Sequence, residues 1–83
     1  APFRSRGIMT EVVRDFCEMI FENTSLTRLE AMVYTYNPAS ARVLEKSGFI
    51  REGLMRHAVK KDDKYVDAWL YSRLKGDPVP TGN

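Results

Sequence analysis

The stretch that decides the fold reads Asn37-Pro38-Ala39-Ser40-Ala41-Arg42-Val43-Leu44-Glu45-Lys46-Ser47-Gly48-Phe49. An asparagine followed by a proline is typical of a helix start, because the Asn side chain caps free N–H groups and Pro fits the first helical position. Gly48 supplies the residue with positive φ that commonly follows a helix end. The stretch therefore predicts a short helix that runs from Pro38 to Ser47 and is capped by Asn37.

The segments on either side of this helix predict the rest of the fold. Before it, residues 8–23 carry one apolar helical stripe, and Arg28–Tyr34 alternate as a strand does. After it, an extended stretch runs from Phe49 to Val59, and Gly53 within it predicts a bulge or a close backbone approach. Residues 61–64 form a hairpin turn, and a strand returns to Leu74. The order helix, strand, helix, strand, strand predicts an α/β fold of the mixed α+β kind, with three strands in a small mixed sheet.

Length and composition indicate one small globular domain. The chain has 83 residues, a formal charge of +2 and a hydrophobic share of 43%, which is ordinary for a folded segment. We assign the domain to residues 1–75 and predict a disordered tail over residues 76–83, which are rich in Gly and Pro. A chain this short buries a thin core, so we expect marginal stability.

Several classes of protein are disfavoured by the composition. Cys17 and His57 are the only residues of their types, so we expect no internal disulfide and no metal site. No run approaches the roughly 20 apolar residues of a membrane span, and the N-terminus lacks a secretory signal, so we expect a cytoplasmic protein without a membrane partner. Basic and acidic residues are interleaved, which argues against a nucleic-acid surface.

Two segments carry candidate chemistry. Arg4-Ser5-Arg6-Gly7-Ile8-Met9 is a basic turn that leads into a helix, whose first N–H groups suit a phosphate or pyrophosphate. By itself this segment is more typical of a solvated turn. Asn37 presents an amide at the carboxyl edge of the sheet, where ligands of open α/β sheets bind; it also serves as a helix cap, and both roles can hold together.

Taken as a pair, the two segments resemble the GNAT superfamily of N-acetyltransferases. Arg4, Gly7 and, imperfectly, Met9 match its R/Q-x-x-G-x-G/A pyrophosphate loop. The stretch from Asn37 to Phe49 is similar to the N-x-x-S-x-R-V-L-E-K-x-G-F run of the branch with the ribosomal-protein alanine and spermidine acetyltransferases. The resemblance extends from Arg4 to Leu74 and implies the C-terminal, cofactor-binding half of such an enzyme.

The resemblance also implies a ligand and a set of residues. The ligand is acetyl-coenzyme A (acetyl-CoA), whose pyrophosphate would lie on the backbone amides of Arg6, Gly7, Ile8 and Met9 with Arg4 nearby. Asn37 would bind the pantetheine arm, with Ser40 and Arg42 close to the cofactor. The reaction would be direct attack by a primary amine, either a protein N-terminal α-amine or a small amine, on the thioester.

Three departures from the family pattern keep a rival hypothesis open. Met9 replaces a small residue and would either crowd the cofactor or point into the core, and Leu44 replaces a tyrosine that protonates the leaving thiolate in many members. The family's N-terminal half has no counterpart here, so we expect an exposed strand edge and an uncovered apolar face, with dimerisation, strand exchange or low stability. The rival is a non-catalytic module that binds coenzyme A weakly or only self-associates; a small nucleic-acid-binding domain is a third, weaker alternative. The acceptor, the general base and the general acid are not indicated.

Overall fold

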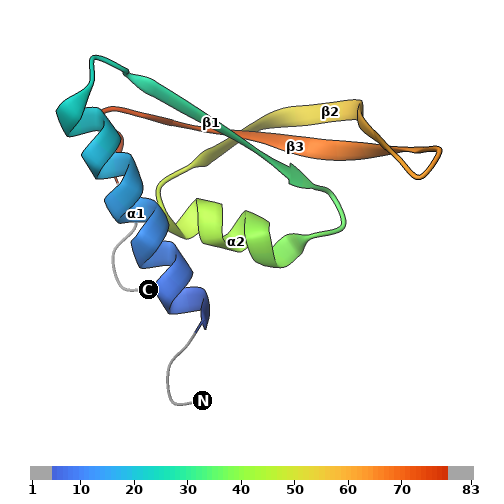
Figure 1. The fold of residues 1–83 in the computed structure, drawn as a ribbon, viewed down its shortest axis with the longest axis horizontal. Coiled ribbons are helices and arrows are strands. Elements are labelled where there is room, and N and C mark those ends of the chain that lie inside the picture. The colour runs from blue at the N-terminus through green and yellow to red at the C-terminus, as the bar shows by residue number, and fades with distance from the viewer. Residues whose placement is uncertain (1–4, 79–83) are drawn as a thin grey trace.

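Two helices cover one face of a three-stranded sheet (Figure 1). The computed structural model describes residues 5–78, and side chains from Met9 onward. Its elements are α1 (Ser5–Asn23), β1 (Arg28–Tyr34), α2 (Pro38–Lys46), β2 (Ile50–Lys61) and β3 (Lys64–Leu74). The α/β class, the order of the elements and the number of strands are as the sequence predicts.

The sheet is antiparallel throughout, with the strand order β1-β3-β2. The prediction of a mixed sheet was wrong for the described residues. β1 and β2 run in the same direction, as expected for two strands joined through a helix, but β3 lies between them and opposes both. The second strand of the hairpin therefore separates β1 from β2, and β1 and β2 form the two edges of the sheet.

The core lies between the helices and the sheet. Cys17 and Phe21 of α1 meet Val33 and Tyr71 from the strands, and Ala41 and Phe49 close the cluster from α2 and the segment after it. Only one side of the apolar stripe of α1, the side with Cys17 and Phe21, packs in this core. A second apolar row on this helix stays about half exposed: Met9, Val12, Phe16 and Met19. The uncovered apolar face expected from the sequence is therefore present.

Arg73 joins three elements beneath this core. Its side chain is 2% exposed, and its Nη1 donates to the backbone oxygen of Ser47 at 3.1 Å. Nη2 pairs with the Glu18 carboxylate of α1, and the guanidinium lies 5.8 Å from the ring centroid of Phe21. A strand residue thus holds α1 and the end of α2 in place.

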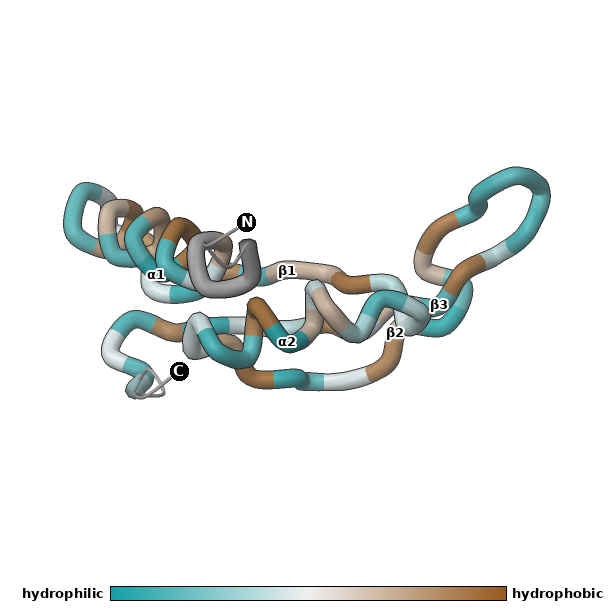
Figure 2. The backbone as a smooth tube through the Cα atoms, turned by 90° about the horizontal axis from the view of Figure 1, so that it is seen from below, coloured by the Kyte–Doolittle hydropathy of each residue, from teal (hydrophilic) through white to brown (hydrophobic). Residues whose placement is uncertain are grey.

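The β2–β3 hairpin projects beyond the helices, and its tip is hydrophilic (Figure 2). Asp62 and Asp63 have φ angles of 52° and 65°, as a two-residue hairpin turn requires. Of the two alternatives at Gly53, the bulge is confirmed by a shift of register between Arg51 and Gly53, and no atom of the described residues approaches the backbone there closely enough to require a glycine. A second irregularity, between Met55 and Val59, was not predicted.

The ends of the described chain depart from the sequence predictions in one respect. α1 begins at Ser5, so the prediction of a turn over Ser5, Arg6 and Gly7 was wrong; none of the three breaks a helix that continues into a strong apolar stripe. At the other end, Asp77 exchanges hydrogen bonds with Leu74 through its backbone N–H (3.0 Å) and its Oδ2 (2.9 Å). Residues 79–83 of the predicted tail lie outside the described residues.

Candidate functional site

Asn37 is held in place between the turn that it closes and the helix that it initiates. Its backbone N–H donates to the Tyr34 oxygen at 3.0 Å, and its Oδ1 accepts from the Ser40 N–H at 3.2 Å. The predicted cap is confirmed. Because the cap uses only the oxygen, the side-chain NH₂ group has no partner within residues 5–78 and keeps two donors for a ligand.

An apolar hollow of about 390 Å³ lies between β1 and α2. A second hollow of about 320 Å³ shares three of its lining residues and leads to Asn37. We call the two together the groove. Its walls are Met9, Ala31, Met32, Val33, Tyr34, Asn37, Ala39, Ser40, Val43 and Leu44. The groove thus extends from an amide at one end to the N-terminal part of α1 at the other.

Residues assigned to the pyrophosphate loop lie at this second end. Arg6 and Gly7 belong to the first turn of α1, where backbone N–H groups have no intrahelical acceptor. Met9 is the fifth residue of the helix and so falls within the regular hydrogen-bond pattern. The side chains of Arg6 and Ile8 and the whole of Arg4 lie outside what the structure describes.

Met9 and Leu44, the two departures from the family pattern, both line the groove. Met9 is 49% exposed, so the alternative in which it points into the core was wrong. Leu44 is half-buried and offers only carbon atoms to the groove. The wall therefore suits an apolar arm, and position 44 supplies no proton to a leaving group.

Ser40 and Arg42 lie on opposite flanks of α2. Ser40 lines the groove, whereas Arg42 lines a different cavity on the far flank. The structure thus brings together Met9, Asn37 and Ser40 of the predicted set, and it separates Arg42 from Met9 and Ser40. Tyr34 and Met32 line the groove but were missed from the sequence; their position at the end of β1, shortly before Asn37, is the signal that would have indicated them.

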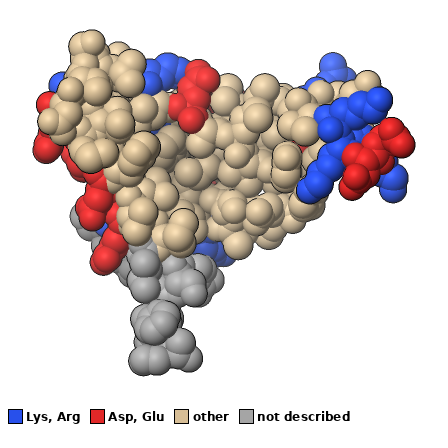
Figure 3. Space-filling view, in the orientation of Figure 1, with Lys and Arg blue, Asp and Glu red and all other residues tan. Residues whose placement is uncertain are grey.

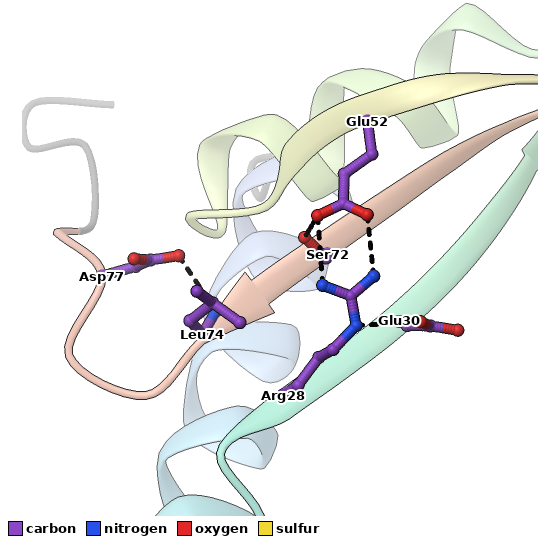
Figure 4. A network of polar contacts seen from close by, with 6 residues as sticks. All are labelled: Arg28, Glu30, Glu52, Ser72, Leu74 and Asp77. Carbon is purple, nitrogen blue, oxygen red and sulfur yellow. Dashed lines mark hydrogen bonds and ion pairs between the residues drawn. The ribbon is translucent and has the colours of Figure 1, made fainter.

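Other reactive side chains are occupied elsewhere. Cys17 is 2% exposed, and burial raises the pKa of its thiol. This cysteine therefore packs in the core and does not serve as a nucleophile. Hydrogen bonds from Arg28 and Ser72 lower the pKa of Glu52 to about 2 (Figure 4). Asp67 accepts the backbone N–H of His57 at 2.8 Å. The groove is lined by none of the side chains named in this paragraph: Cys17, Arg28, Glu52, His57, Asp67 and Ser72.

The described residues carry neither a metal-ligand cluster nor a membrane-spanning helix. Within them, no three His, Cys, Asp or Glu side chains gather as metal ligands would. Neither of the two described helices has the length and apolar character needed to cross a membrane.

Comparison with known proteins identifies the family. The family model described as "Acetyltransferase (GNAT) domain" matches residues 1–50, more than half of the chain. This chain belongs to the GNAT acetyltransferase family. The matched part of this GNAT chain contains α1, β1 and α2 and so all of the groove.

Individual relatives agree with this assignment. The GNAT chain is 42% identical over 72 residues to the probable N-acetyltransferase YjcK of Bacillus subtilis, covering 87% of this chain and 40% of the relative. It superposes on the ribosomal-protein-S5-alanine acetyltransferase of Vibrio fischeri with a TM-score of 0.81 at 28% identity, covering 94% of this chain and 43% of that one. A spermidine N-acetyltransferase of Vibrio cholerae shares the fold, with a TM-score of 0.79 at 21% identity over 90% and 45% of the two chains. The chain thus spans about two fifths of the length of the curated relatives.

Proposed function

We propose that this chain forms the acetyl-CoA-binding half of an N-acetyltransferase that acetylates a primary amine. The observation that carries the proposal is the groove: an apolar channel with an unengaged amide donor at one end and the N-terminal part of α1 at the other. A pantetheine arm has the same pattern, because its carbon chain is interrupted by carbonyl oxygens that accept hydrogen bonds.

Each part of the proposed site has a distinct task. The free amides of Arg6, Gly7 and Ile8 face the pyrophosphate, with Arg4 and Arg6 as counter-charges, and the helix dipole favours the anion there. The Met9 N–H lies within the helical hydrogen-bond pattern, so the proposed contribution of Met9 is its side chain on the groove wall. Asn37 donates to a carbonyl of the arm, and Ser40 lies beside it on the groove wall. For Arg42, which lies on the other flank of α2, the proposed cofactor role is limited to long-range charge attraction.

The proposed reaction is a direct transfer. A neutral amine nitrogen bonds to the thioester carbon, the C–S bond breaks, and the amine proton leaves as the thiolate gains one. Since Leu44 is apolar, the acid that serves the thiolate is not at this position. The 28% identity to the ribosomal-protein-S5-alanine acetyltransferase supports a primary amine as acceptor and favours a protein N-terminal α-amine. A cytoplasmic location remains a prediction.

Titration of the ¹⁵N-labelled chain with acetyl-CoA tests the proposal, with calorimetry in parallel. We expect saturable binding and the largest amide shifts at Gly7, Ile8 and Asn37. Absence of binding at millimolar ligand from a folded chain would contradict the proposed site.

The rival function is a non-catalytic module that binds coenzyme A weakly or only self-associates. Leu44 specifically favours it, because the groove wall has no proton donor at that position. Release of coenzyme A thiol in the presence of an amine distinguishes the two. Thiol release above the rate without chain favours the enzyme, and binding without release favours the module.

A further inference from the structure

The far flank of α2 borders a second, polar cavity of about 650 Å³. We call it the basin. It is lined by charged side chains of α2 and by Arg51 and Trp69 from the sheet. It meets the groove only at Asn37, which lines both.

Three cations and one acid line the basin, so its walls carry an excess of two positive charges. The cations are Arg42, Lys46 and Arg51, and the acid is Glu45. In a concave site, charges of one sign raise the local concentration of the opposite ion.

Arg51 and Glu45 are already paired with their surroundings. The Arg51 guanidinium lies 4.1 Å from the ring centroid of Trp69, and its Nη2 is 3.7 Å from Glu45 Oε2. The same Glu45 oxygen accepts the hydroxyl of the fully buried Tyr71 at 2.7 Å. Burial, together with this hydrogen bond, raises the pKa of Tyr71, so the phenol stays a neutral donor. The Glu45 charge is thus engaged on the Arg51 side.

Arg42 and Lys46 are left as the uncompensated pair. They stand four residues apart on one face of α2, where like charges destabilise a helix. Among the described residues, neither side chain has a carboxylate within ion-pair distance. An anion between them would relieve this repulsion and receive charge-assisted hydrogen bonds from both.

We propose that the basin binds the phosphate group of a small phosphate ester. A phosphate dianion matches the excess of two charges, and the guanidinium of Arg42 offers the paired donors that phosphate oxygens accept. The volume falls in the range of pockets that hold a small organic ligand and exceeds what a bare ion needs. The proposal is independent of acetyl-CoA binding, because the basin and the groove lie on opposite flanks of α2.

The test is NMR titration of the chain with ribose 5-phosphate, ribose and inorganic phosphate. We expect saturable shifts at Arg42, Lys46 and the Trp69 indole with the ester, weaker ones with inorganic phosphate and none with ribose. The double variant Arg42→Gln/Lys46→Gln should bind the ester about tenfold more weakly or worse, since two charge-assisted contacts are lost. The matched control Lys60→Gln/Lys64→Gln removes two charges from the distant hairpin and should bind as the parent does.

Three results would overturn the proposal. These are equal weakening in both double variants, equal affinity for inorganic phosphate and the ester, and displacement of the ester by acetyl-CoA. The last would assign the phosphate to the acetyl-CoA site. A chain that binds the ester but not acetyl-CoA would refute the proposed function and leave the basin standing.

Discussion

Asn37 combines two roles that a substitution can separate. Its oxygen caps α2 through Ser40, while its NH₂ group is the donor offered to the groove. Asn37→Ser keeps a capping oxygen and removes the amide, so we expect an unchanged melting temperature and acetyl-CoA binding weakened about tenfold. Asn37→Ala should lose both, with about 1 kcal/mol of stability. Calorimetry and thermal unfolding measure the two effects, and parent-like binding by Asn37→Ser would exclude the donor role.

Cys17 should be chemically silent in the folded chain. Its thiol is 2% exposed and burial raises its pKa, so little thiolate is accessible near neutral pH. We expect the Cys17 thiol of the native chain to react with a thiol reagent only as fast as the chain unfolds. In denaturant, it should react as fast as a free thiol. Rapid reaction of the native protein would show that the core around α1 opens more readily than its packing indicates.

Single residues differ in how far the sequence predicts them. The capping role of Asn37 followed from the residue type and its neighbour, because a cap is a local structure. The placement of Arg42 did not, since which flank of a helix faces a groove depends on the strands packed against it. Arg73 was missed entirely, because a charged strand residue gives no local sign that two helices will bury it.

At the scale of elements, Arg73 is the tie between α1, α2 and β3. Arg73→Met keeps much of the apolar packing but leaves the Ser47 oxygen and Glu18 without their partner. We expect a loss of about 2–3 kcal/mol in the free energy of unfolding, because a buried carbonyl loses a charged donor. Glu18→Gln is the control. Because Glu18 is half exposed, this substitution should lower the free energy of unfolding by less than about 1 kcal/mol. If both substitutions cost the same, the ion pair with Glu18, and not the hydrogen bond to Ser47, would be the main contribution of Arg73.

Arg28 and Glu52 link the outer strands across β3, with Ser72 donating to the same carboxylate (Figure 4). The pKa of Glu52 is lowered to about 2, so its contribution to stability is complete above the ordinary Glu range and is lost as pH falls toward 2. Glu52→Gln should therefore melt below the parent at pH 7, with the difference shrinking between pH 4.5 and 2. Thermal unfolding across this range measures it, and a constant difference would exclude the ion pair as its cause.

Elements were predicted well where the signal was local. The bounds of β1 and the start of α2 follow from alternation and from Asn-Pro, and the hairpin follows from its turn residues. Which strands pair is decided by long-range contacts, and the periodicity of the sequence carries no information about them. The predicted mixed sheet could therefore not be distinguished from the antiparallel one by sequence. The bulge at His57, with φ of 52°, rests on a contact with Asp67 ten residues away.

At the scale of the molecule, the face in Figure 3 is largely uncharged over its centre, most of its basic side chains lie at the hairpin end, and acidic side chains lie along the α1 side. The half-exposed row of Met9, Val12, Phe16 and Met19 and the free edge of β1 both lack a partner within the described residues. Exposed apolar surface and unpaired strand edges favour association.

We therefore expect the purified chain to self-associate in a concentration-dependent way. Phe16 is 55% exposed, so Phe16→Glu should leave the fold intact while placing a charge in the apolar row, and sedimentation should then show a monomer. Ser25→Glu adds the same charge at an exposed loop position beyond the helix and should associate as the parent does. If Phe16→Glu still associates, the free edge of β1 is the remaining contact. Met32→Pro removes an N–H from this edge strand and introduces no charge, so this substitution should then dissociate the chain. If the parent chain stays monomeric at high concentration, neither the apolar row of α1 nor the edge of β1 drives self-association.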